Sequence, residues 1–160
     1  MPELRKDPVM GRWVIISTER AKRPDEFLPL VPARNESQPD CPFCLGHEAK
    51  TPPEITAIRP SGGNPNGPGW TVRVVPSIAP VLRIEGKLEH RARGLYDVCT
   101  GIGAHEILVE TPEHISSMAS LPPEQISQVL ETAIARIKDL EKDPRFKYVL
   151  FFKNYGTAAG

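Results

Sequence analysis

Apolar and polar residues alternate, or β-branched residues gather, in several short segments of this chain. The clearest of these segments predict β-strands at residues 12–18, 70–76, 105–111 and 147–153. Weaker signals predict short strands at residues 81–85 and 95–99. The chain is therefore expected to contain several short strands joined by turns.

One segment shows the periodicity of an amphipathic helix, between residues 122 and 143. Its apolar residues recur every three or four positions: Ile126, Val129, Leu130, Ala133, Ile134, Ile137 and Leu140. Two prolines fit the first turn, where a missing N–H costs little, and Asp143-Pro144 ends the helix. Strands precede this helix and one strand follows it, without regular βαβ alternation. This order predicts an α+β fold with a mostly antiparallel open sheet and the helix packed on one face.

Length and composition indicate a single globular domain. The 160 residues include 18 prolines, which imply long, stiffened loops such as residues 28–40. Twenty basic residues balance 20 acidic residues, so bulk electrostatic binding to nucleic acid or to an anionic membrane is not expected. No apolar run approaches the roughly 20 residues of a membrane span. The polar start of the chain lacks a signal-peptide core, so a cytoplasmic location is expected.

The cysteine pattern raises the possibility of a metal site. Cys41 and Cys44 form a Cys-x-x-Cys pair, and two thiolates at this spacing can bind one tetrahedral zinc ion. A thiol redox role is the alternative, although no thioredoxin-like βαβ pattern surrounds the pair. A zinc site needs further ligands, and the residues alone leave four candidates open: His47, Cys99, His105 and His114.

Two loops carry groups suited to phosphate binding. Arg20 and Arg23 follow a predicted strand, and guanidinium groups bind phosphate through paired hydrogen bonds. Asn154 and Gly160 lie in the loop after the last predicted strand, where an amide and a flexible backbone can approach a nucleotide. Taken alone, such segments are more commonly solvated turns than phosphate-binding loops.

Five motifs, in this order along the chain, resemble the N-terminal half of galactose-1-phosphate uridylyltransferases. The members of this family are nucleotidyltransferases of the histidine-triad superfamily. The resemblance covers residues 7–160, and its motifs are DPVMGRWVIISTERAKRP, CPFC, RVVP, HEILVETPEH and FFKNYGTAAG. It implies a histidine-triad-like fold with residues 1–160 as the N-terminal domain. It also implies a homodimeric enzyme that transfers UMP between a UDP-sugar and a sugar 1-phosphate through a covalent nucleotidyl-histidine, by ping-pong kinetics.

The resemblance also assigns the zinc ligands and the nucleophile. Structural zinc would be held by Cys41, Cys44 and His114, with the first histidine of a His-Pro-His motif as the fourth ligand. The nucleophile belongs to the same motif, which is expected just beyond Gly160. No catalytic residue is therefore expected within this chain, and residues 1–160 alone are predicted to be inactive.

The remaining family contacts concern the nucleotide sugar. Arg20 and Arg23 match arginines near its phosphates, and Asn154 and Gly160 match the phosphate-contacting loop. Phe43 would pack on the base or ribose. Ser77 stands where the family usually has an asparagine that contacts the ribose. This departure leaves open an adenylyl-transferring relative of the ADP-sugar phosphorylase type, or a zinc- or nucleotide-binding module without catalysis.

Overall fold

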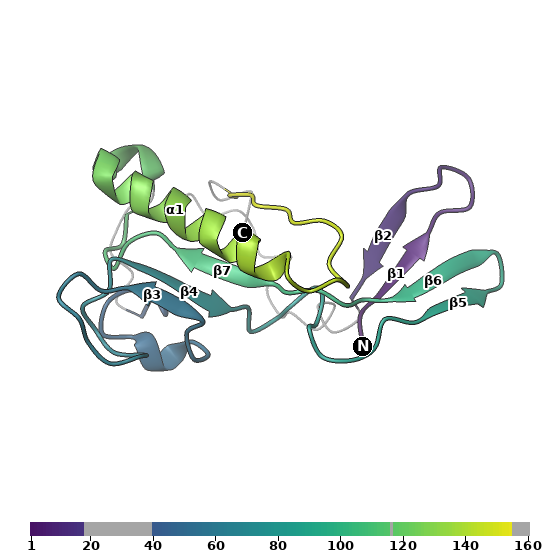
Figure 1. Cartoon of the computed structure of the whole chain (residues 1–160), viewed down its shortest axis with the longest axis horizontal. Helices are drawn as coiled ribbons and strands as arrows, with labels where there is room; N and C mark the ends of the chain where they lie inside the picture. Colours follow the sequence, from purple (N-terminus) through teal and green to yellow (C-terminus); the bar gives the residue numbers. More distant parts are fainter. Residues whose placement is uncertain (18–39, 116, 155–160) are drawn as a thin grey trace.

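The structure is a computed structural model that describes residues 1–17, 40–115 and 117–154. Within these residues, seven strands form two antiparallel open sheets, and one α-helix lies along the smaller sheet (Figure 1). The predicted α+β class and the antiparallel arrangement are confirmed. The strands, however, are divided between two sheets.

The larger sheet has the order β2-β1-β6-β5 and forms the end of the molecule that contains the N-terminus (Figure 1). Its strands are β1 (Glu3–Lys6), β2 (Trp13–Ile16), β5 (His90–Arg93) and β6 (Tyr96–Thr100). Arg93 pairs with Tyr96, which leaves Gly94 and Leu95 as a two-residue hairpin loop. Gly94 has φ +61°, as the first position of such a loop requires.

The smaller sheet has the order β3-β4-β7 and contains most of the core. Its strands are β3 (Thr56–Ile58), β4 (Val72–Pro76) and β7 (Glu106–Val109). The central strand β4 is buried on both faces, because residues 72 to 75 alternate in direction and all are covered. One of them is Arg73, which is only 1% exposed and donates a hydrogen bond from Nε to Glu54 Oε2 at 2.9 Å.

Helix α1 (Pro123–Leu140) packs against the smaller sheet through Val129 and Ala133 (Figure 1). Arg136 fastens it to β7 by two hydrogen bonds to the Glu106 carboxylate, at 2.7 and 2.8 Å. Gln125 Nε2 donates to the carbonyls of Thr71 and Glu110, at 2.8 and 2.5 Å. The first turn of the helix is therefore anchored where β4 begins and β7 has just ended. The described residues also contain two short 3-10 helices, η2 (Glu48–Lys50) and η3 (Met118–Ser120).

Two of the strand predictions are wrong. Residues 81–85 make a single bridge between Arg83 and Ile102 instead of a strand. Residues 147–153 belong to no ladder in the described structure, and Tyr148 and Phe152 are exposed. Aromatic and β-branched content gives a strand propensity, but a strand forms only where a partner edge is available. The strands predicted near residues 12–18, 70–76 and 105–111 are confirmed in shorter form, and the strand predicted at 95–99 is confirmed one position later, as β6.

Candidate metal centre

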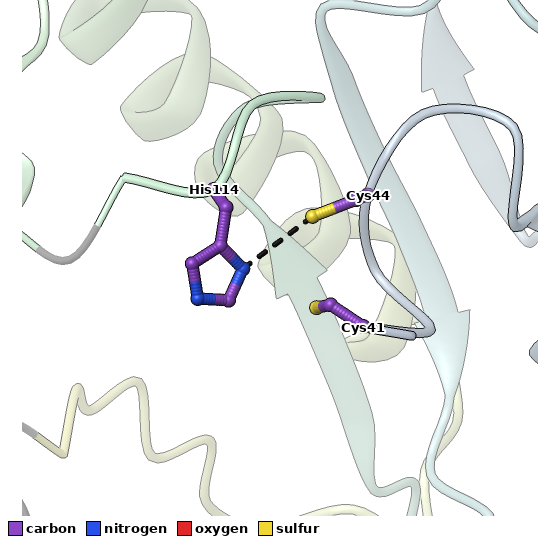
Figure 2. Close-up of side chains that lie close together, drawn as sticks. All are labelled: Cys41, Cys44 and His114. Atoms are coloured by element: carbon purple, nitrogen blue, oxygen red, sulfur yellow. Dashed lines mark hydrogen bonds between the residues drawn. The ribbon is translucent and has the colours of Figure 1, made fainter. Parts of the chain in front are cut away.

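The Cys-x-x-Cys pair lies in a compact turn, residues 41–47. The Cys44 amide donates to the Cys41 carbonyl at 3.4 Å, and the His47 amide donates to the Cys44 carbonyl at 3.1 Å. Both cysteine side chains are half-buried and free of disulfides. The turn directs the two thiols toward the same point (Figure 2).

His114 reaches this point from the loop that follows β7. The Leu45 amide donates to the Pro112 carbonyl at 3.0 Å, which joins the cysteine turn to this loop. Nδ1 of His114 lies 3.4 Å from Sγ of Cys44, and the ligand atoms of Cys41, Cys44 and His114 all lie within 4.8 Å of one another (Figure 2). The structure therefore brings together the three residues that the resemblance assigned to the metal.

This donor set fits a zinc-type ion. With Zn–S about 2.3 Å and Zn–N about 2.05 Å, tetrahedral geometry places a sulfur and a nitrogen ligand about 3.6 Å apart. The observed separation of 3.4 Å between Cys44 Sγ and His114 Nδ1 is close to this value. Two thiols and an imidazole are also the ligands that zinc favours in structural sites.

The surroundings of Cys44 disfavour the thiolate form of its side chain unless a cation is bound nearby. Burial and the neighbouring Cys41 thiol raise the pKa of the Cys44 thiol. A divalent cation reverses this effect, because it stabilises the thiolate directly.

The other candidate ligands have different partners. Sγ of Cys99, on β6, lies 4.0 Å from Nε2 of His90 on the larger sheet. His105 Nδ1 accepts a hydrogen bond from the Val81 amide at 3.2 Å. Nδ1 of His47 lies 2.6 Å from the Cys41 carbonyl oxygen. Among the described residues, the metal-ligand cluster consists of Cys41, Cys44 and His114.

The predicted nucleotide contacts are only partly described. Arg20, Arg23 and Gly160 lie outside the described residues. Phe43 is half-buried in the turn between the two cysteines, and Asn154 is exposed.

Ser77 lies at the far end of the β4–β7 pair from the metal cluster. It follows the last residue of β4, and its amide donates to the His105 carbonyl, just before β7 begins. The cysteine turn instead contacts the loop after the end of β7. From its first residue to its last, β4 spans about 13 Å, at roughly 3.3 Å per residue. The structure does not bring Ser77 to the metal cluster.

Sequence reasoning missed a polar cluster beneath the cysteine turn. Glu48, Trp70 and Arg73 are buried and joined by hydrogen bonds. A lone acidic residue in a charged stretch gives no sign that it is buried. The tryptophan that opens the β4 segment was the one available signal, since a buried indole N–H usually has a partner.

Comparison with known proteins shows which proteins this chain resembles. The family profile described as "Galactose-1-phosphate uridyl transferase, N-terminal domain" matches residues 82–160. ADP-glucose phosphorylase of Arabidopsis thaliana is 34% identical, covering 99% of this chain and 45% of that protein. Galactose-1-phosphate uridylyltransferase of Thermotoga maritima is 27% identical, covering 100% of this chain and 43% of that protein. A solved structure titled "Structure of uridylyltransferase" matches with a TM-score of 0.66 and 29% identity, covering 99% of this chain and 41% of that one.

The chain thus spans less than half the length of these relatives. No helix in the described parts of the chain is long and apolar enough to cross a membrane.

Proposed function

The chain belongs to the galactose-1-phosphate uridylyltransferase family, and we propose that residues 1–160 are the N-terminal, histidine-triad-like domain of a nucleotidyltransferase. The proposed substrates are a nucleotide sugar of the UDP-glucose or UDP-galactose type and a sugar 1-phosphate. This proposal rests on one observation: the cysteines of the CPFC turn lie next to His114 of the ETPEH loop. These two motifs lie far apart in the sequence, and both belong to the family pattern.

The proposed reaction proceeds in two displacements. A histidine attacks the α-phosphorus of the nucleotide sugar, the bond to the sugar phosphate oxygen breaks, and sugar 1-phosphate leaves. A second sugar 1-phosphate then attacks the nucleotidyl-histidine and takes the UMP group. None of the four histidines of this sequence lies in a His-Pro-His motif. We therefore propose that residues 1–160 bind the nucleotide sugar and that the nucleophile belongs to a segment outside them.

Cys41, Cys44 and His114 are proposed to hold a structural zinc ion, with the first histidine of His-Pro-His as the fourth ligand. Bound zinc supplies a rigid cross-link between its ligands. The cysteine turn and the loop after β7 already contact one another through Leu45 and Pro112. A histidine nucleophile next to the fourth ligand would be positioned by the same two segments.

Arg20, Arg23, Asn154 and Gly160 are proposed to contact the phosphates, and Phe43 and Ser77 the base and ribose. Phe43 can be tested directly, because it lies in the described cysteine turn. We expect Phe43→Ala to weaken nucleotide-sugar binding by about tenfold, the loss of one aromatic stacking contact. Tyr148→Ala is the matched control, since Tyr148 is an exposed aromatic residue without a proposed role.

A second candidate is transfer of AMP instead of UMP. The 34% identity with ADP-glucose phosphorylase exceeds the 27% with the Thermotoga uridylyltransferase, and this difference favours the adenylyl reaction. Ser77 supports it as well, because it replaces the asparagine usual in the uridylyl-transferring pattern. A zinc- or nucleotide-binding module without catalysis is the remaining alternative.

Two experiments test the proposal. Titration calorimetry measures the binding of UDP-glucose and of ADP-glucose. The chain is then incubated with each nucleotide sugar carrying a label in its α-phosphate. We expect one nucleotide sugar to bind more tightly and no label to become covalently attached. Absence of binding by either compound would contradict the proposed substrate class. A covalent label on residues 1–160 would contradict the proposed location of the nucleophile. The proposed cytoplasmic homodimer is tested separately, by light scattering after size-exclusion chromatography.

A further inference from the structure

A buried carboxylate fastens the cysteine turn to the smaller sheet. It belongs to Glu48, the first residue of η2, four positions after Cys44 and only 7% exposed. We propose that Glu48 is a positioning residue of the metal centre, which holds Cys41 and Cys44 at the distance from His114 that a metal ion requires. This inference rests on the metal centre in the proposed function.

One oxygen of Glu48 bridges the turn and the sheet. Oε1 accepts a hydrogen bond from the Gly46 amide at 3.2 Å and a second from Trp70 Nε1 at 2.8 Å. Gly46 lies in the cysteine turn with φ +85°, and Trp70 is 2% exposed just before β4. A single buried atom therefore sets the position of the turn relative to the start of β4.

Arg73 contacts the same residue through its backbone carbonyl. Its Nη2 donates to the Glu48 carbonyl at 3.4 Å and its Nη1 to Thr51 Oγ1 at 2.9 Å. Burial opposes the charged form of Glu48, but the hydrogen bonds from Trp70 and the Gly46 amide, with the nearby Arg73 charge, lower the pKa of its carboxyl group. Glu48 is thus a charged acceptor at neutral pH, with both its side chain and its carbonyl group engaged.

Strand β4 therefore positions both parts of the metal centre, the cysteine turn and His114. His114 follows β7, which pairs with β4 from Arg73↔Val109 to Pro76↔Glu106. The cysteines are tied to the start of β4 through Glu48 and Trp70. Loss of the Glu48 bridge would let the turn shift relative to His114, and removal of such outer contacts typically weakens metal binding 10- to 100-fold.

Three variants of the 160-residue chain separate positioning from general stability. Glu48→Ala removes the acceptor. Glu48→Gln keeps an oxygen that can accept from both Gly46 and Trp70. Val129→Ala is the control, because it truncates a fully buried side chain of α1, outside the cysteine turn in sequence, and lowers stability.

The measurement is Co²⁺ affinity, from the thiolate-to-cobalt absorption in competition with a chelator, with circular dichroism and thermal unfolding in parallel. We expect Glu48→Ala to bind Co²⁺ 10- to 100-fold more weakly than wild type. Glu48→Gln should stay within about threefold, since the bridging oxygen is retained. Val129→Ala should unfold at a lower temperature with unchanged Co²⁺ affinity.

Wild-type affinity in Glu48→Ala, or an equal loss in Val129→Ala, would overturn the positioning role and leave the metal centre intact. Absence of Co²⁺ binding by the wild type would instead overturn the metal centre itself. If Glu48→Ala fails to fold, Trp70→Phe serves in its place, because it removes one of the two donors and keeps most of the ring. It should weaken Co²⁺ binding by about three- to tenfold, and unchanged affinity would contradict the proposal.

Discussion

Sγ of Cys44 lies 3.4 Å from Nδ1 of His114, although 70 positions separate the two residues in the chain. Their approach depends on the pairing of β4 with β7 and on the hydrogen bond from the Leu45 amide to the Pro112 carbonyl. The candidate metal centre is therefore a product of tertiary structure. Metal affinity should respond to changes in the ligands and in the segments that carry them.

Replacement of the histidine ligand should remove most of the metal affinity. His114→Ala leaves two thiols as protein ligands, and we expect Co²⁺ or Zn²⁺ to bind at least 100-fold more weakly in a competitive chelator titration. His90→Ala is the matched control, because His90 is an exposed histidine on the larger sheet. Equal metal affinity in the two variants would show that His114 is not a ligand.

Gln125 should contribute to stability by bridging α1 to the sheet. Its side-chain amide donates to the carbonyls of Thr71 and Glu110. Gln125→Ala leaves both carbonyls without this donor, so we expect the free energy of unfolding to fall by about 1–3 kcal/mol in urea denaturation. Glu131→Ala, an exposed change on the same helix, should alter it by less than about 0.5 kcal/mol. A Gln125→Ala effect no larger than that of Glu131→Ala would rule out the bridging role.

Acid should destabilise the fold partly through Glu54. Burial opposes ionisation of this carboxyl group, but hydrogen bonds from Arg59, the Asn66 amide and Arg73 hold its pKa at about 2, below the ordinary value of 4.5. A lowered folded-state pKa adds stability above pH 4.5, on the order of 3 kcal/mol, which is lost as the pH falls toward 2.

Urea denaturation of wild type and Glu54→Gln at a series of pH values measures this contribution. The wild-type free energy of unfolding should fall more steeply between pH 5 and pH 2, because the variant has no proton to gain at this position. At pH 7 the variant should be less stable, since Arg73 then loses a buried charged partner. Parallel pH profiles for the two proteins would exclude Glu54 as a source of acid sensitivity.

The helix and the central strand could be predicted well from the sequence. The apolar period between residues 122 and 143 indicates a helix, and α1 covers Pro123–Leu140. The ends differ by a few residues, because Pro122 is the N-cap and the residues after Leu140 form turns. Apolar residues recur every three or four positions when one face of a helix is buried. This periodicity can be recognised from the local sequence alone.

Strands without apolar periodicity could not be predicted in this way. The β1 sequence ELRK and the β5 sequence HRAR are rich in charged residues, and both strands exist because they pair with β6. The opposite error occurred at residues 147–153, where an aromatic run has no paired edge in the described structure. Gly94-Leu95 was a usable signal for the β5–β6 hairpin, since a glycine suits the first position of a two-residue loop.

The candidate site could likewise be predicted only in part from the sequence. The Cys-x-x-Cys spacing identifies Cys41 and Cys44, but spacing alone did not choose among the other possible ligands. His114 came from the family resemblance, and the β4–β7 pairing explains why it reaches the cysteines. Glu48 had no sequence signal, because its burial depends on Trp70, 22 positions away.

X-ray absorption spectroscopy of the zinc-loaded chain tests the proposed metal centre most directly. We predict one zinc per chain, with two sulfur ligands at about 2.3 Å and at least one imidazole nitrogen at about 2.0 Å. The sulfur shell should disappear in a Cys41→Ser, Cys44→Ser double variant. A zinc shell made only of nitrogen and oxygen atoms in the wild-type chain would contradict the assignment of Cys41, Cys44 and His114 as the metal centre.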